Sequence, residues 1–215
     1  MKKQFVVIGL GRFGSSVART LSAEGHDVLA IDVRENAVQA IMNDVTHAVQ
    51  ADAREEENLK ALGVRNFDVA VVAIGDDLQA NILITLMLKE MGIRYVVAKA
   101  QTNLHGRVLE KVGADKIIYP EKDMGVRVAH NLVTSNIMDY IALSPDYSIA
   151  EIVTPRKFIG KTLGELDLRA KYHISVMAIR NGDKVNVAPG SEASIQENDI
   201  LVVVSKNKDI EKLPE

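Results

Sequence analysis

Six short apolar segments rich in β-branched residues recur along the first 120 residues, and a longer helix-like pattern follows most of them. This alternation is typical of a doubly wound parallel sheet, because each parallel strand needs a long crossover to return to the same sheet. The predicted strands are 5–9, 27–32, 47–52, 68–75, 95–100 and 116–120. The predicted helices are 11–24, 35–43, 55–62, 78–91 and 105–112.

The pattern changes after residue 120. Apolar side chains recur mostly three to four residues apart from Val126 to Ile141, which predicts a helix over 121–143 with Pro120 at its entrance. This helix could pack on its own sheet, or it could link the domains or form a dimer contact, and the sequence leaves these alternatives open.

Shorter strand patterns separated by turns follow Tyr147 and indicate a small α+β domain. They are 148–153, 174–180, 184–190 and 199–204. The expected organisation is a first domain at 1–135, a linker and helix end at 136–146, and a second domain at 147–215.

Charge and cysteine content exclude several classes of protein. The net charge of −3 gives no support for nucleic-acid binding, which usually needs a basic face. The chain has no cysteine, which excludes disulfides and thiolate metal sites and fits a cytosolic protein. The longest apolar run after the N-terminal one, 82–88, is far shorter than the roughly 20 residues of a membrane span.

The first predicted strand runs into a glycine-rich turn, G-x-G-x-x-G, formed by Gly9, Gly11 and Gly14. In such turns the first glycine allows the tight bend, the second lets phosphates approach the backbone, and the third lets the helix pack on the sheet. The free N–H groups and the positive dipole end of the following helix favour an anion. Because the motif stands between a strand and a helix, we expect a nucleotide here.

Asp32 ends the second predicted strand, where such domains hold a ribose diol. A carboxylate there disfavours the 2′-phosphate of NADP but does not separate NAD from ATP, ADP or AMP. Arg12 stands in the first helical turn, where a positive charge opposes the helix dipole unless an anion is bound. Further candidate nucleotide contacts lie within the turn and at the ends of the third and fourth strands: Phe13, Asp52, Ala53, Ala73, Ile74 and Gly75.

No pattern in the chain points to catalysis. The five histidines have no metal-ligand spacing, and neither a G-x-S-x-G elbow nor a P-loop is present. The remaining 70 or so residues leave little room for a substrate domain. We therefore expect a protein that is not an enzyme, with a small NAD(H)-dependent oxidoreductase or an NAD(H)-binding redox sensor as the alternative.

Four longer strings resemble the Ktr cytosolic regulatory subunits, members of the wider group of regulators of conductance of potassium (RCK). They are FVVIGLGRFGSSVA, NFDVAVVAIGDDLQAN, AKAQTNLHGRVLEKVGADKIIYPEKDMG and LDLRAKYHISVMAIR. The resemblance implies a Rossmann-like first lobe and a small second lobe. It further implies dimers that assemble into an octameric ring beneath an integral membrane potassium transporter, so that the protein is cytoplasmic and peripheral to the membrane. A free-standing nucleotide sensor without a transporter is a third possibility.

The resemblance also assigns roles to single residues of the first lobe. It implies that ATP and ADP bind at the glycine turn and Asp32, and that Arg12 reaches the γ-phosphate of ATP, that of the neighbouring subunit. Lys99 would meet phosphate. Glu121 would help to hold a cation beside the phosphates, such as Mg²⁺, Ca²⁺ or Na⁺.

For the second lobe, the resemblance implies a binding site for cyclic di-AMP between two copies. The matching wall is Arg169, Ile174, Ser175 and Pro189, with Phe158 and Leu163 as apolar neighbours. His173 and Ser175 stand where close relatives carry glycine and asparagine, so the ligand of this lobe stays open beside an ordinary dimer interface.

Overall fold

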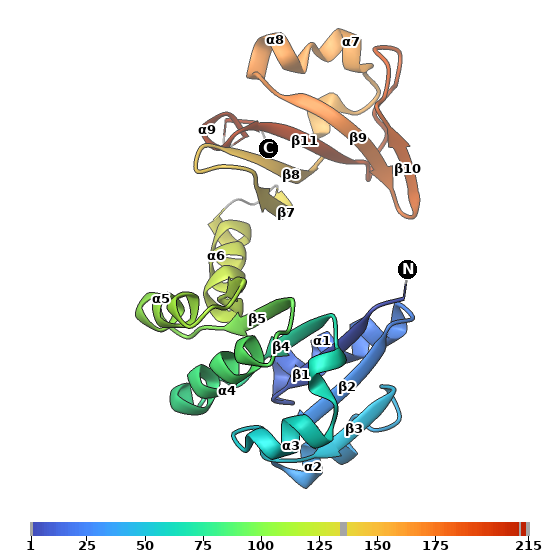
Figure 1. Cartoon of the computed structure of the whole chain (residues 1–215). Helices are drawn as coiled ribbons and strands as arrows, with labels where there is room; N and C mark the ends of the chain where they lie inside the picture. The colour runs from blue at the N-terminus through green and yellow to red at the C-terminus, as the bar shows by residue number, and fades with distance from the viewer. Residues whose placement is uncertain (1, 134–136, 211, 214–215) are drawn as a thin grey trace. The chain divides into compact units, whose positions relative to one another are not determined.

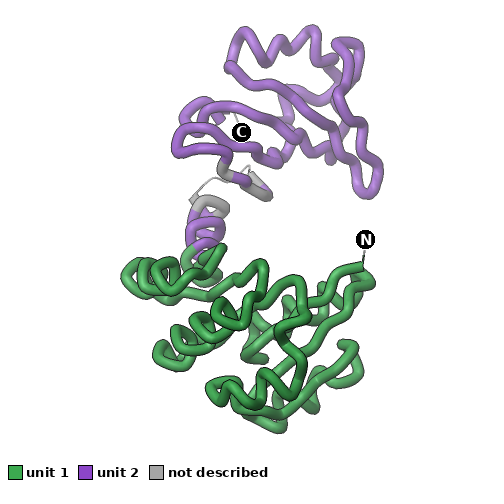
Figure 2. The backbone as a smooth tube through the Cα atoms, viewed as in Figure 1, with its two compact units in different colours: residues 1–122 green, residues 123–215 purple. Residues whose placement is uncertain are grey.

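A computed structural model of the chain describes residues 2–133, 137–210 and 212–213. The chain divides into two compact units, residues 1–122 and 123–215 (Figures 1 and 2). The predicted domain limits at 135 and 147 differ from this division, because helix α6 crosses the border between the units.

The first unit contains a six-stranded, fully parallel sheet in the order β3-β2-β1-β4-β5-β6. Its strands are β1 Gln4–Ile8, β2 Asp27–Asp32, β3 His47–Gln50, β4 Val69–Val72, β5 Tyr95–Lys99 and β6 Lys116–Ile118. Its helices are α1 Arg12–Ala23, α2 Glu35–Gln39, α3 Glu56–Ala61, η1 Val64–Asn66, α4 Leu78–Glu90 and α5 Asn103–Lys111. The predicted Rossmann-like α/β fold is confirmed, with β4 ending three residues earlier than expected.

Helices cover both faces of this sheet, as the apolar pattern of its strands requires. Side chains alternate between the faces along each strand, so Val6 and Ile8 contribute to one buried cluster while Val7 contributes to the other. The first cluster includes residues of α3, α4 and α5, and the second is closed by α1 and α2. Each layer of helices therefore has its own core.

The strand order reverses direction at β1, which lies between β2 and β4. The chain leaves β1 toward β2 on one side, whereas β4 continues the sheet on the other side. A crevice opens at such a point outside the carboxyl ends of the strands, where ligands of open α/β sheets bind.

The helix predicted over 121–143 is only half correct. Helix α6 spans Pro120–Val133, with the expected proline at its start, but Ile137–Ala142 form strand β7. Strand β7 pairs antiparallel with β8, with Ile141 opposite Ile149. The isoleucines at 137 and 141 fit a helical repeat equally well, so pairing with a distant strand overrides the local pattern. Residues 134–136 lie outside the described part of the chain.

The second unit contains an antiparallel sheet in the order β10-β9-β11-β8-β7. Its other strands are β8 Tyr147–Val153, β9 Ser175–Asn181, β10 Lys184–Val187 and β11 Ile200–Lys206. The short helices are η2 Arg156–Phe158, α7 Leu163–Leu166, α8 Leu168–Tyr172 and α9 Asn207–Ile210. The small α+β domain predicted from the turn-rich pattern is confirmed.

Within the described residues, none of the helices combines the length and the apolar character that a membrane span would need.

The packing of the second unit generates a prediction for its central strand. Leu201 of β11 is buried in the core, whereas Val187 at the end of edge strand β10 is 74% exposed. Leu201→Ala should lower the free energy of unfolding by about 2–5 kcal/mol, because it leaves a cavity. Val187→Ala should change it by less than about 0.5 kcal/mol. Urea unfolding followed by circular dichroism measures both values, and equal losses would contradict the assigned core.

Candidate nucleotide-binding site

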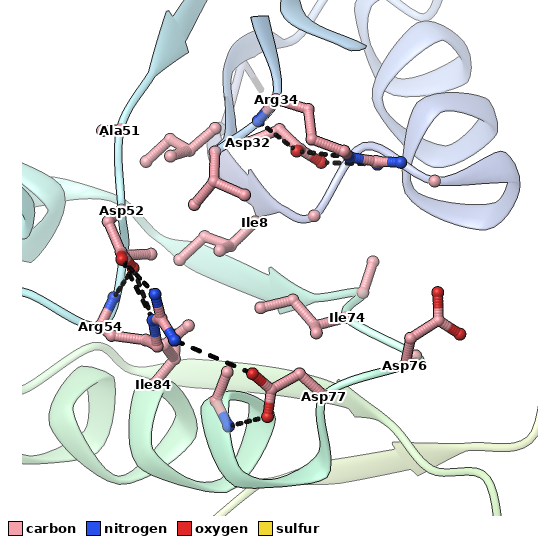
Figure 3. Close-up of a pocket in the computed structure, with 18 residues that line it drawn as sticks. Ile8, Asp32, Arg34, Ala51, Asp52, Arg54, Ile74, Asp76, Asp77 and Ile84 are labelled. Atoms are coloured by element: carbon pink, nitrogen blue, oxygen red, sulfur yellow. Dashed lines mark hydrogen bonds and ion pairs between the residues drawn. The ribbon is translucent and has the colours of Figure 1, made fainter.

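A pocket of about 470 Å³ lies at the carboxyl ends of β1, β2 and β4 and just beyond the end of β3, where the strand order reverses. It is lined by Ile8, Gly9, Gly11, Ile31, Asp32, Val33, Arg34, Ala51, Asp52, Ala53, Arg54, Ala73, Ile74, Gly75, Asp76, Asp77, Ala80 and Ile84. Figure 3 shows two Asp–Arg pairs, Asp32 with Arg34 and Asp52 with Arg54, at separate places on its wall. The pocket thus combines an apolar floor with a charged rim, as small-molecule sites commonly do.

Each of the three glycines in the turn is required, or tolerated, for a different physical reason. Gly9 has φ +94°, and a Cβ there would lie 3.0 Å from the backbone nitrogen of Ile74. A Cβ at Gly14 would collide with the carbonyl oxygen of Gly9, so this glycine lets α1 pack directly on the turn. At Gly11 no atom lies within 4 Å of an added Cβ. Gly9 and Gly14 are therefore needed by the fold, whereas Gly11 leaves open space at the pocket.

Helix α1 begins at Arg12, immediately after this open glycine. The N-cap Gly11 makes no side-chain cap, and the first turn contains no acidic residue. Nothing in the side chains of this first turn therefore balances the positive end of the helix dipole, which favours an anion.

Asp32 is buried and accepts four hydrogen bonds. Its Oδ2 accepts from the Leu10 N–H at 2.6 Å and from Arg34 Nη2 at 3.1 Å, while its Oδ1 accepts from the Arg34 N–H and Nε. Burial alone would raise the pKa of Asp32, but the hydrogen bonds from Arg34 and Leu10 outweigh it and hold that pKa below its usual value. A carboxylate has about four lone-pair sites, so a ribose diol can bond to Asp32 only if Arg34 releases it.

The second Asp–Arg pair, Asp52 with Arg54, lies just beyond the end of β3 and also joins an aspartate to the arginine two residues later. The Arg54 Nη2 lies 2.6 Å from Asp52 Oδ2, and its Nη1 lies 4.0 Å from Asp77. The hydrogen bond from Arg54 lowers the pKa of Asp52. Asp77 also accepts the Ala80 N–H and so caps α4. Asp52 thus positions Arg54 at the pocket wall.

Lys99 and Glu121 lie beside Gly75 rather than in the lining itself. The Lys99 Nζ lies 2.7 Å from Glu121 Oε1 and 3.2 Å from the position that a Cβ on Gly75 would take. The hydrogen bond from Lys99 lowers the pKa of Glu121, and the charge of Arg12 acts in the same direction. Lys99, Glu121 and Arg12 therefore form one charged group next to the glycine turn.

Several predicted site residues are thus brought together, and others are not. Eight belong to the pocket lining: Gly9, Gly11, Asp32, Asp52, Ala53, Ala73, Ile74 and Gly75. Gly14 is buried behind the turn and does not line the pocket. Arg12 is exposed outside the lining, and Phe13 packs against the cluster beneath α1 and α2.

Sequence reasoning missed Arg34 and Arg54, the two cations of the rim. Each follows an acidic residue by two positions just beyond a strand, in the spacing Asp-x-Arg. That repeated spacing was the signal that could have found them.

Glu121 is the one carboxylate proposed for a cation. Among the described residues, no cluster of three or more histidine or acidic side chains could hold a metal ion. Glu121 therefore fits a cation only together with oxygens of a bound phosphate, an arrangement that suits Mg²⁺.

In the second unit, the predicted wall divides into two groups. Phe158 and Ile174 are buried in the core cluster, so they support the wall from behind. Arg169 is exposed, and Leu163, Ser175 and Pro189 are partly exposed. Only these four present surface to a ligand in a single copy.

Comparisons with known proteins agree with this geometry. The TrkA-N domain matches residues 5–120, and the TrkA-C domain matches residues 148–215. The Ktr system potassium uptake protein C of Bacillus subtilis is 48% identical over 212 residues, 99% of this chain and 96% of that protein. The Ktr system potassium uptake protein A of the same organism is 48% identical over 210 residues, 98% of this chain and 95% of that protein.

The chain belongs to the Ktr branch of the TrkA/RCK family. The crystal structure of the GsuK RCK domain superposes with a TM-score of 0.67 at 18% identity. The match covers 98% of this chain and 46% of that one, and it confirms the RCK fold.

The different environments of two glycines predict different effects of adding a methyl group. Gly11→Ala should leave the thermal midpoint nearly unchanged, because the Cβ meets no protein atom, but it should weaken nucleotide binding by filling the open space. Gly14→Ala should lower the thermal midpoint, because its Cβ collides with the Gly9 carbonyl. Differential scanning fluorimetry with and without ATP tests both. A Gly11→Ala protein that unfolds early would contradict this assignment.

The lowered pKa of Asp32 predicts a pH dependence of stability. A carboxylate with a depressed pKa in the folded state stabilises the protein above its unfolded pKa, and this contribution is lost as the pH falls through the folded value. Asp32→Asn should therefore reduce the loss of stability between pH 7 and about pH 3, around and below the ordinary Asp pKa. Denaturant unfolding across this range measures it. Asp183→Asn, at the exposed turn before β10, is the control and should keep the original profile.

Proposed function

We propose that this protein is a regulatory subunit of a Ktr-type potassium uptake system that binds ATP or ADP in its first unit and gates a membrane transporter. The observation that carries the proposal is the uncapped end of α1 opening beside a pocket at the switch point of a Ktr-like chain. Nearly the whole length of the chain matches the Ktr proteins, which favours the same role.

The pocket residues suggest a division of work. The N–H groups at the start of α1 and the space at Gly11 would receive the phosphates. Asp32 would hold the ribose after exchanging its bonds with Arg34. The apolar floor around Ala53 and Ile84 would take the adenine. Because both hydroxyls of an adenosine ribose fit a carboxylate, NAD(H) stays the alternative ligand.

Arg12, Lys99 and Glu121 would distinguish ATP from ADP. Lys99 lies beside Gly75 at the phosphate end, and Glu121 would share a cation such as Mg²⁺, Ca²⁺ or Na⁺ with the phosphates. Arg12 does not line the pocket of its own chain, which favours a contact with the γ-phosphate of a nucleotide in a neighbouring copy. Only ATP would then bridge two subunits.

Such a bridge is a means of switching. A ligand shifts a conformational equilibrium only by its different affinities for the two states, and the γ-phosphate contact supplies that difference. We propose that dimers assemble into an octameric ring and that its conformation is transmitted to an integral membrane potassium transporter. The subunit would then lie on the cytoplasmic side as a peripheral protein, with no nucleic acid among its partners.

The second unit would add a second ligand. Arg169, Ser175 and Pro189, with Leu163 beside them, would contact cyclic di-AMP between two copies, with Arg169 pairing with a phosphate. A regulatory role leaves no need for catalysis, and the proposal is that the protein is not an enzyme. Oxidation of NADH that depends on an added substrate would favour the oxidoreductase instead.

The proposed role is tested in a bacterium that lacks its own potassium uptake systems and carries only a Ktr membrane subunit. Expression of this chain should restore growth at low potassium, and the chain should co-purify with the membrane subunit. The Gly11→Ala variant should co-purify but restore growth poorly, since it weakens nucleotide binding and leaves assembly with the membrane subunit intact. Absence of both growth and co-purification with the wild-type chain would overturn the proposal.

The Arg12 contact predicts different losses for two nucleotides. Arg12→Ala should weaken ATP binding by about tenfold or more, because a charge-assisted contact to the γ-phosphate is removed. ADP binding should change by less than about threefold. Calorimetric titration with magnesium measures both affinities. Arg65→Ala, which removes an exposed arginine of η1, is the matched control, and equal losses for ATP and ADP in Arg12→Ala would count against the γ-phosphate role.

A further inference from the structure

A second hollow lies in the second unit, and it includes none of the six residues expected to contact cyclic di-AMP. Its volume is about 510 Å³, and it is lined by Tyr147, His173, Lys206, Lys208, Asp209 and Lys212. Tyr147 begins β8 and pairs in register with Lys206 at the end of β11. The remaining lining comes from His173 just after α8, from Lys208 and Asp209 of α9, and from Lys212 beyond α9. Three separate stretches of the chain, around residues 147, 173 and 206–212, therefore meet here.

The charge of this hollow is opposite to that of the chain. Three lysines and one aspartate leave a net charge of +2 with His173 neutral, whereas the whole chain carries −3. The Lys212 Nζ pairs with Asp209 at 2.9 Å. Within the described residues, Lys206 and Lys208 have no carboxylate oxygen within ion-pair distance. Two lysines of the hollow thus have no ion-pair partner among the described residues.

Neighbouring groups hold part of this lining in place. The Lys206 Nζ lies 5.6 Å from the centroid of the Tyr147 ring, a cation–π distance. His173 has a left-handed backbone with φ 59°, and its carbonyl accepts a hydrogen bond from the buried Ser205 hydroxyl at 2.8 Å. The side chain of Asp209 is 8% exposed, and the hydrogen bond from Lys212 lowers its pKa, with His173 and Lys208 acting in the same direction. Fixed neighbours reduce the entropy that a ligand must overcome to order the site.

We propose that this hollow binds a phosphoryl group, either of a small phosphorylated compound or of a lipid headgroup. A phosphate monoester carries close to two negative charges at neutral pH, which matches the net charge of the lining. Lysine ammonium groups bind phosphate as point charges, and the Tyr147 hydroxyl adds a donor. The volume also exceeds that of one phosphate, so the lining leaves room for the group to which the phosphate is attached.

Pyrophosphate tests whether the hollow binds the phosphoryl group of a small soluble compound. Full-length protein whose first pocket is saturated with ADP should bind pyrophosphate at low salt, and added salt should weaken this binding. Lys206→Gln with Lys208→Gln should weaken it by about tenfold or more, as expected when charge-assisted contacts are lost. The control pair, Lys157→Gln with Lys184→Gln, removes two exposed lysines outside the lining and should leave it unchanged.

Lipid vesicles test whether the hollow binds the phosphoryl group of a lipid headgroup. Sedimentation with phosphatidylcholine vesicles, with and without phosphatidic acid, should show binding that needs the acidic lipid, depends on Lys206 and Lys208, and is displaced by pyrophosphate. Pyrophosphate binding without vesicle binding assigns the site to a soluble compound instead. If neither probe binds, or if both double variants lose binding equally, the proposal is overturned. Retained ADP binding in the double variants separates this outcome from failure of the nucleotide site in the first unit.

Discussion

The first unit depends on the close approach of helix α1 to the turn after β1. Gly14 packs so near the Gly9 carbonyl that a single methyl group would separate them. This contact directs the positive end of α1 to the edge of the sheet where β1, β2 and β4 end. Asp32 then fixes the turn from the other side by accepting the Leu10 N–H. The N-terminus of α1, the glycine turn and the Asp32 carboxylate therefore all lie at one pocket. The close contact between Gly14 and Gly9 keeps them together there.

The hydrogen bonds of the Asp32 carboxylate are already satisfied by groups of the protein itself. Its four acceptor positions are filled, two of them by the Arg34 side chain, so a ligand at Asp32 has to compete with an internal partner. A second Asp–Arg pair at Asp52 repeats this chemistry on another part of the wall (Figure 3). Competition of this kind lowers apparent affinity without reshaping the pocket, and it would let a regulatory subunit respond to changes in ligand concentration rather than stay saturated.

The sequence was sufficient for features that local patterns determine. Alternating apolar strands and helices predicted the parallel sheet, and the glycine spacing with Asp32 predicted the pocket. It was insufficient where distant pairing decides. Ile137 and Ile141 repeat as in a helix, yet β8 recruits them into a strand. Phe158 and Ile174 become core residues only once the second sheet closes around them. Partners far apart in the sequence determine both outcomes. Arg34 and Arg54 differ, because each pairs with a carboxylate only two residues away, and the local Asp-x-Arg spacing was a signal that went unused.

The central claim is that the first unit is built for an adenine nucleotide. The most direct test is calorimetric titration of nucleotide-free, full-length protein with ATP, ADP and NADH, each with and without magnesium. We expect ATP and ADP to bind at one site per chain, NADH to bind much more weakly, and magnesium to strengthen the binding of ATP more than that of ADP. Tight binding of NADH together with weak binding of both adenine nucleotides would contradict it and would assign the pocket to a redox cofactor.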